Sequence, residues 1–195
     1  FIYWQMTRGT GIRQHQFPEK GTKPNLWIFM KPGKHGSTDK RLKLTDMEDT
    51  RFLHCNIKTL NLLVNVMAAE KAEEAGCGEC VFHRGDIVTE CAHSNVSIIK
   101  DGIFKTHPAD HYILPGITRM HLIQICKDNG IPVDETPFTM QELMDADEVI
   151  VSSSTKFCAP ACEMNGTPIG GKAPELISLL QEKYLEKFEN ETKAE

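Results

Sequence analysis

The sequence lacks several features that would assign it to a large class of proteins. No apolar run approaches the ~18 consecutive residues of a helix that spans a bilayer, so no membrane partner is expected. No segment has the pattern of a secretory signal peptide. No dense Lys/Arg cluster is present: 22 Lys and Arg residues are interleaved with 27 Asp and Glu residues, and the net charge is −5. Because nucleic-acid binders usually present a basic face, nucleic acid is not an expected partner.

The seven cysteines are an odd number and lack the density of a small disulfide scaffold. Reduced thiols in a cytoplasmic protein are therefore expected. Cys77 and Cys80 form a lone C-x-x-C with His83 nearby, but a zinc site needs a second pair at matching spacing. Cys158 and Cys162 are the available candidates, and their spacing does not match. We expect buried thiols and no metal.

The chain starts at Phe1 rather than at Met, and residues 1–6 already have the character of a strand. A chain that begins inside a strand is expected to be a fragment or a processed product, here without the N-terminal part of its first domain. A second strand is expected at residues 24–30, which are apolar and aromatic.

A domain boundary is expected at residues 31–37. This segment combines Gly, Pro and charge with no apolar period, as linkers do. Residues 1–33 are then the C-terminal end of a small N-terminal domain, and residues 34–195 form a larger domain.

The clearest helix is predicted at residues 59–75. Its apolar residues follow the i, i+3, i+4, i+7, i+8 spacing of a buried stripe, and Gly76 can end it. The stripe consists of Leu60, Leu63, Val64, Met67 and Ala68. Lys58 is expected at the start of this helix, directly after an extended segment at residues 51–57.

Hairpins and helices alternate irregularly along the rest of the chain. Three two-residue turns, each between apolar runs, predict β-hairpins. They are Gly85-Asp86, Asp101-Gly102 and Asn165-Gly166. Helices are expected at residues 116–130, after the capping box Thr139–Glu142, and at residues 174–188, with a short buried strand at residues 149–151. This order, without strict βαβ alternation, indicates an α+β fold.

One set of residues can serve a single chemistry, although each member alone is more often a solvated or capping residue. A pyridoxal 5'-phosphate enzyme needs a lysine that holds the cofactor covalently, an acid beside the pyridine nitrogen, and donors for the phosphate. Lys58 can be the lysine, and Glu90 can keep the ring nitrogen protonated. Backbone N–H groups at a helix N-terminus and hydroxyls suit a phosphate. The candidates for that role are Ile117, Thr118, Ser153 and Ser154.

Four segments resemble the class IV aminotransferases, in that family's order and spacing. They are Cys55–Asn61, Thr89-Glu90 with Ser94-Asn95-Val96, Leu114–Arg119 and Val151–Thr155. The resemblance implies a D-amino-acid-aminotransferase-like fold, in which the end of a small α/β domain precedes a large cofactor-binding domain. It also implies that Lys58 holds pyridoxal phosphate and carries protons, that Glu90 contacts the pyridine nitrogen, and that the protein is a homodimer.

The segment Thr7–His15 resembles the D-amino-acid enzymes of that class, in which an R-x-H motif binds the substrate carboxylate. Arg13 would bind the carboxylate with its planar guanidinium, and His15 would assist. The implied reaction is transamination between a D-amino acid and a 2-oxo acid such as 2-oxoglutarate or pyruvate.

Three alternatives remain beside this interpretation. They are an aminodeoxychorismate lyase, a branched-chain L-amino-acid aminotransferase, against which Arg13 and His15 speak, and an inactive product of a truncated gene. The sequence also departs from the family pattern at Asn56 and Thr59, and it has Cys91-Ala92-His93 in place of a small Gly/Ser stretch. His93 could alter the pocket beside the cofactor.

Overall fold

The computed structural model describes residues 1–33 and 40–193. Two compact units are distinguished, Phe1–His35 and Gly36–Glu195, and each is described by itself. Most of the predicted linker at 31–37 lies outside the described residues.

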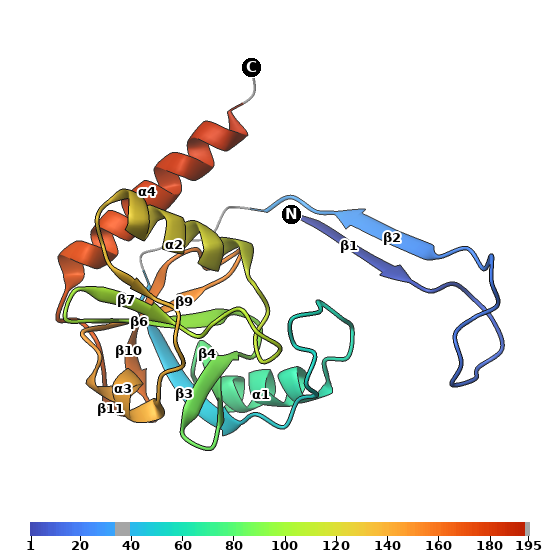
Figure 1. Cartoon of the computed structure of the whole chain (residues 1–195), viewed down its shortest axis with the longest axis horizontal. Helices are drawn as coiled ribbons and strands as arrows, with labels where there is room; N and C mark the ends of the chain where they lie inside the picture. The colour runs from blue at the N-terminus through green and yellow to red at the C-terminus, as the bar shows by residue number, and fades with distance from the viewer. Residues whose placement is uncertain (34–39, 194–195) are drawn as a thin grey trace. The chain divides into compact units, whose positions relative to one another are not determined.

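The first unit is a β-hairpin with a long connecting loop, drawn as the blue ribbon in Figure 1. Strands β1 (Ile2–Thr7) and β2 (Asn25–Met30) pair antiparallel over their whole length, which confirms both predicted strands. Residues directly opposite in an antiparallel pair share one face. One face of this hairpin is entirely apolar and exposed. It consists of Ile2, Trp4, Met6, Leu26, Ile28 and Met30.

The second unit is built on one mixed sheet with the strand order β5-β4-β3-β10-β9-β6-β7-β8, to which β11 adds by pairing with β10. The strands are β3 (Leu42–Glu48), β4 (Glu79–Arg84), β5 (Ile87–Cys91), β6 (Asn95–Lys100), β7 (Ile103–Thr106), β8 (Val133–Asp134), β9 (Glu148–Ser152), β10 (Ala159–Met164) and β11 (Thr167–Pro168). Strand β3 pairs parallel with β4 and β10, whereas the β4–β5, β6–β7 and β6–β9 pairs are antiparallel. This mixture confirms the α+β class.

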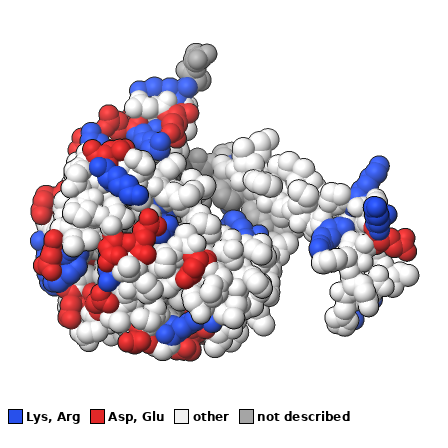
Figure 2. Space-filling view, in the orientation of Figure 1, with Lys and Arg blue, Asp and Glu red and all other residues white. Residues whose placement is uncertain are grey.

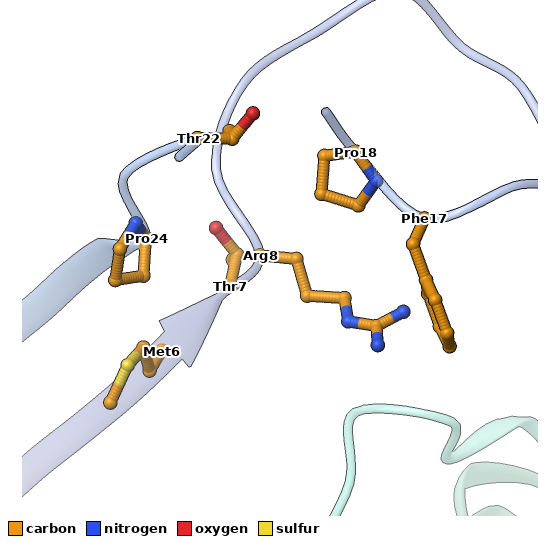
Figure 3. A pocket seen from close by; sticks show the side chains of 7 residues that line it. All are labelled: Met6, Thr7, Arg8, Phe17, Pro18, Thr22 and Pro24. Atoms are coloured by element: carbon orange, nitrogen blue, oxygen red, sulfur yellow. The ribbon is translucent and has the colours of Figure 1, made fainter. Parts of the chain in front are cut away.

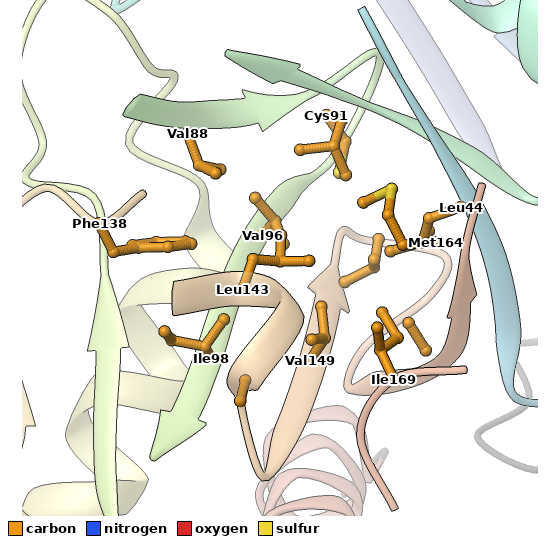
Figure 4. Close-up of a cluster of buried hydrophobic side chains, with 14 residues drawn as sticks. Leu44, Val88, Cys91, Val96, Ile98, Phe138, Leu143, Val149, Met164 and Ile169 are labelled. Atoms are coloured by element: carbon orange, nitrogen blue, oxygen red, sulfur yellow. The ribbon is translucent and has the colours of Figure 1, made fainter. Parts of the chain in front are cut away.

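The described residues of this unit also form the helices α1 (Leu63–Glu74), α2 (Ile117–Asp128), α3 (Met140–Asp145) and α4 (Pro174–Thr192). Helices α2 and α4 pack on each other, as Figure 1 shows, and bury Leu122, Cys126 and Leu180 against sheet residues. Helix α3 closes a second apolar cluster around Leu143 and Phe138 (Figure 4). These two clusters fix the ends of β5, β6 and β9, from which the candidate site is built.

Three predicted turns form as expected. In the β6–β7 hairpin, Asp101 and Gly102 have φ values of 50° and 76°. In the β10–β11 hairpin, Asn165 and Gly166 have φ values of 48° and 79°. Positive φ at both central residues is the geometry that Asn, Asp and Gly tolerate best. The β4–β5 turn and the capping box of α3 are also confirmed.

The prediction for the first helix was wrong in its start and in its buried face. Helix α1 begins at Leu63, because the Thr59 hydroxyl accepts a hydrogen bond from the Asn61 backbone N–H and holds a local turn there instead. The residues that pack on β4 are the small ones, Ala68 and Ala72, which allow close approach to the sheet. The predicted stripe is largely on the outside: Leu60, Leu63 and Met67 are exposed, and Val64 is half-buried.

Two further expectations fail nearby. The segment 51–57 is not extended, since it turns at residues 55–56, and the Ile57 N–H bonds to the His54 carbonyl at 3.1 Å. Lys58 therefore follows a turn, and residues 59–62 separate it from the first residue of α1. Strand β3 was not predicted at all, although it lies between β4 and β10.

Among the described residues, no helix is long and apolar enough to cross a membrane. On the larger unit, Lys and Arg side chains alternate with Asp and Glu side chains over the face seen in Figure 2. The seven cysteines are free thiols.

Candidate cofactor site

A buried carboxylate occupies the predicted acid position. Glu90 lies near the end of β5, and both its oxygens are bound. Arg51 Nη1 donates to Oε1 at 2.5 Å, while Asn95 Nδ2 and the Leu114 backbone N–H donate to Oε2 at 3.1 and 3.0 Å. Three donors from separate segments thus fix its orientation.

Arg51 is itself held by a second carboxylate. Its Nε and Nη2 atoms donate to the two oxygens of Asp49 at 2.9 Å each, and its guanidinium lies 4.5 Å from the Phe82 ring centre. The Thr89 hydroxyl also donates to Asp49. Sequence reasoning missed Asp49 and Arg51, because two charged residues two positions apart in a polar stretch are indistinguishable from a solvated pair.

Burial and charge oppose each other at Glu90. Desolvation raises the pKa of Glu90 to about 7, although the Arg51 guanidinium and the Leu114 N–H favour the ionised form. Burial would lower the pKa of Arg51, but its bonds to Asp49 and Glu90 outweigh this and raise it. Arg51 is therefore a permanent cation, and Glu90 is poised to exchange a proton near neutral pH.

The N-terminus of α2 can bind an anion. Its N-cap, Gly116, is extended (φ −64°, ψ 137°), and no side chain caps the helix, so the first backbone N–H groups at Ile117 and Thr118 remain available. A Cβ at Gly116 would clash with the Asn95 side-chain oxygen. Gly116 therefore lets the start of α2 lie directly against Asn95, the residue that also donates a hydrogen bond to Glu90.

The Thr118 side chain points elsewhere. Its hydroxyl lies 3.3 Å from the Tyr184 hydroxyl of α4, and the residue is buried. At Thr118, a ligand can therefore be bound by the backbone N–H.

The turn after β9 carries the two predicted serines. Ser153 is half-buried and Ser154 is exposed. The Ser153 hydroxyl accepts from the Lys156 backbone N–H at 3.2 Å, and the Phe157 N–H bonds to the Ser153 carbonyl at 2.9 Å, so the turn is closed. Next to it, the Ser152 hydroxyl is buried without a hydrogen-bond partner in the described part of the chain.

Lys58 is exposed, so a ligand can reach its amine. The turn before it is anchored by the Cys55 N–H, which bonds to the His111 carbonyl at 3.0 Å. Within residues 1–33 and 40–193, its amine has no hydrogen-bond or ion-pair partner.

The predicted carboxylate-binding residues, Arg13 and His15, lie in the first unit, and both are exposed. That unit also contains an open hollow of about 560 Å³ between the strand ends and the loop (Figure 3). The hollow is lined by Arg8, whose guanidinium lies 3.8 Å from the Phe17 ring centre, and contains neither Arg13 nor His15.

Pyridoxal phosphate fits the groups of the larger unit. Uncapped N–H groups at α2 and an orphaned hydroxyl beside Ser153 suit a phosphate, and a buried carboxylate suits a protonated ring nitrogen. No group of three or more His, Cys, Asp or Glu side chains that could hold a metal ion occurs in the described residues.

Comparisons with known proteins identify the family. Residues 1–164 match the model of the family described as amino-transferase class IV. A D-alanine aminotransferase of Staphylococcus haemolyticus is 44% identical over 191 residues, which are 95% of this chain and 68% of the relative. One from Listeria monocytogenes is 40% identical over 193 residues, 96% of this chain and 66% of the relative. The chain thus spans about two thirds of the length of these relatives.

Solved structures show the same fold. A branched-chain amino acid aminotransferase of Escherichia coli has a TM-score of 0.77 and 22% identity, and the match covers 100% of this chain and 67% of the other. A fold IV-transaminase from Curtobacterium pusillum has a TM-score of 0.77 and 21% identity, over 89% of this chain and 61% of the other. The family match covers most of the sequence, and the chain belongs to the class IV aminotransferases.

Proposed function

We propose that this protein transfers amino groups between D-amino acids and 2-oxo acids with pyridoxal phosphate held by Lys58. The observation that carries the proposal is the 44% identity to a D-alanine aminotransferase across 95% of the chain. The buried Glu90, held by Arg51, Asn95 and Leu114, supports the cofactor chemistry independently.

Lys58 holds the cofactor in the resting protein and moves a proton during the reaction. An exposed amine without a competing ion pair is free to bond to a carbonyl carbon. When bound, pyridoxal phosphate supplies an electron-withdrawing ring that stabilises negative charge at the substrate Cα. Lys58 would then be the residue that takes the proton from the substrate Cα as a general base.

Glu90 keeps the ring nitrogen protonated. Glu90 already accepts from the Arg51 guanidinium, and a second positive charge on the ring nitrogen would further favour the ionised carboxylate. Arg51, fixed by Asp49, prevents Glu90 from turning away.

The phosphate is bound by neutral donors of this unit. The N–H groups of Ile117 and Thr118 and the hydroxyls of Ser153 and Ser154 take this role, helped by the positive end of the α2 dipole. Arg13 and His15 bind the substrate carboxylate and thereby set the preference for the D-enantiomer.

We also propose that the working protein is a homodimer and that it acts in the cytoplasm, where thiols stay reduced; the seven free cysteines support that location. A patch of apolar side chains on α1 and the residues before it is exposed in the single chain, which supports an interface between two copies. The patch consists of Leu60, Leu63, Val66 and Met67, each at least 55% exposed. Soluble monomers seldom expose contiguous apolar surface of this kind.

The test is an amino-transfer assay of the full-length gene product with D-alanine and L-alanine side by side, and with 2-oxoglutarate as acceptor. Transfer from the D-enantiomer is expected. Preference for L-isoleucine or L-leucine would place the protein with the branched-chain enzymes, and pyruvate release from aminodeoxychorismate without an amino acceptor would identify a lyase. Failure to take up pyridoxal phosphate would overturn the proposal.

A further inference from the structure

A second buried carboxylate, which does not contact Glu90, is bonded to the turn that carries Ser153 and Ser154 through Lys156. Glu79, at the start of β4, has no exposed side-chain surface. Its Oε2 accepts from Lys156 Nζ and from the Ser94 hydroxyl, each at 2.8 Å. Its Oε1 lies 3.1 Å from His93 Nδ1. A fully buried anion with three side-chain partners is costly to build and indicates a specific role.

Lys156 is the partner that connects this carboxylate to the serine turn. Its backbone N–H closes the turn on Ser153, and its Nζ reaches Glu79, the Gly78 carbonyl at 3.0 Å and His93 Nε2 at 3.3 Å. An ammonium has three hydrogens, and these three acceptors use all of them. The side chain is therefore fixed at both ends.

His93 completes a closed ring of contacts. Its Nδ1 faces Glu79 and its Nε2 faces Lys156, so one neutral tautomer donates to the carboxylate and accepts from the ammonium. This histidine stands in the stretch where the sequence departs from the family pattern. Burial by itself would raise the pKa of Glu79, but the hydrogen bonds from His93 and Lys156 and the Lys156 charge outweigh it and lower the pKa.

The network joins both halves of the candidate site. On one side, Ser94 precedes Asn95, which donates to Glu90. On the other side, Lys156 lies two residues after Ser154, in the same turn. We propose that Lys156 is a positioning residue that sets the serine turn for the cofactor phosphate by anchoring it to Glu79 and His93.

This inference rests on the proposed function, because it concerns the turn assigned there to the phosphate. It predicts that Lys156 matters for the phosphate and much less for the ring. Pyridoxal, which lacks the phosphate, and pyridoxal phosphate therefore report on different parts of the site. A loss of general stability would weaken both ligands alike.

The experiment uses four forms of the full-length protein, each freed of cofactor. Absorbance titration gives the dissociation constants of pyridoxal and of pyridoxal phosphate for each form. The four forms are wild type, Lys156→Met, the double variant Glu79→Gln/Lys156→Met, and Lys105→Met. The double variant leaves no unpaired buried anion, so it serves as the second variant if Lys156→Met alone does not fold. Lys105, on β7, is a matched control: its side chain is 20% exposed, against 19% for Lys156, and it bonds to Glu142 at 2.8 Å.

In Lys156→Met and in the double variant, affinity for pyridoxal phosphate should fall by about 10-fold or more, as expected for a lost charge-assisted anchor. Affinity for pyridoxal should change by less than about 3-fold, and Lys105→Met should leave both constants near wild type. Equal losses for both compounds, or no loss for either, would overturn the inference while leaving the proposed function intact. A wild-type protein that binds neither compound would overturn the cofactor assignment and this inference together.

Discussion

At the scale of single residues, the site depends on buried charges that support one another. Glu90 is oriented by Arg51, and Arg51 by Asp49, so the acid cannot rotate without breaking a chain of buried bonds. A free carboxylate on a flexible stem would adopt several rotamers and hold a ring nitrogen less well. The sequence predicted Glu90 from its motif, but its support could not be predicted, because it depends on which side chains the folded sheet brings together.

Replacing Glu90 with Gln should slow amino transfer while the protein still binds the cofactor. The amide is neutral and cannot hold the proton on the ring nitrogen, so the rate of Cα proton removal should fall on the order of 10²-fold or more. The measurement is a single-turnover assay with D-alanine. Glu163→Gln, on the surface of β10, is the control. A wild-type rate for Glu90→Gln would show that Glu90 does not keep the ring nitrogen protonated.

The free energy of unfolding of the cofactor-free protein should depend on pH through the titration of Glu90. Its pKa is about 7 in the folded protein, above the ~4.3 of an exposed Glu. A group with a raised pKa in the folded state contributes stability that is complete below the unfolded pKa and is lost as pH rises through the folded pKa. The free energy of unfolding of wild type, measured against Glu90→Gln by urea denaturation, should therefore fall between about pH 4 and about pH 8. A constant or rising difference would contradict the burial argument.

Arg13 should act on substrate binding. Loss of a charge-assisted bidentate contact costs roughly 1.5–3 kcal/mol, so Arg13→Ala should raise KM for D-alanine by about 10- to 100-fold. Lys20→Ala, an exposed cation in the same loop, should leave KM near wild type. Steady-state assays with both enantiomers would check this. An unchanged KM, or equal losses for the two enantiomers, would argue against a role in stereochemical preference.

At the scale of elements, the sequence predicted turns and helix caps correctly, because short-range backbone preferences decide these structures. The Asp101-Gly102 and Asn165-Gly166 turns and the capping box of α3 formed as expected, because φ preferences and cap bonds act within four residues. The buried face of α1 was predicted wrongly. Periodicity shows that a helix has an apolar stripe, but it does not show whether the sheet of the same chain covers that stripe.

The capping box of α3 offers a measurable test of a local signal. The Thr139 hydroxyl accepts from the Glu142 N–H at 3.1 Å, and the Glu142 carboxylate accepts from the Thr139 N–H at 2.8 Å. Thr139→Ala should lower the free energy of unfolding by about 0.5–2 kcal/mol. Thr136→Ala, exposed in the same connection, should change it by less than about 0.5 kcal/mol. Denaturant titrations would measure both, and equal effects would show that the cap is not important here.

At the scale of the whole molecule, the sheet could not be assembled from the sequence. Strand β3 carries Lys43, Asp46 and Glu48 among its seven residues, so its composition does not indicate a strand that pairs on both sides. Two of these charges are paired in the folded sheet, where Lys43 bonds to Glu163 and Asp46 to His83. Only the parallel pairing with β4 and β10, which is long-range in sequence, makes this segment a strand.

The exposed patch on α1 leads to a prediction about assembly. Leu63 is 71% exposed in the single chain, so Leu63→Glu removes little packing within the chain and should leave the fold stable. If a second copy covers the patch, a charge there is buried without a partner, and the dimer should dissociate.

Sedimentation velocity of the full-length protein would measure this dissociation directly. The control is Ile103→Glu, which makes the same change at a residue 40% exposed on β7. We expect wild type and Ile103→Glu to sediment as dimers and Leu63→Glu as a monomer. Because the patch begins two residues after Lys58, at Leu60, the monomer should also lose amino-transfer activity while its circular dichroism stays that of wild type. A Leu63→Glu variant that remains a dimer would show that a different surface joins the copies.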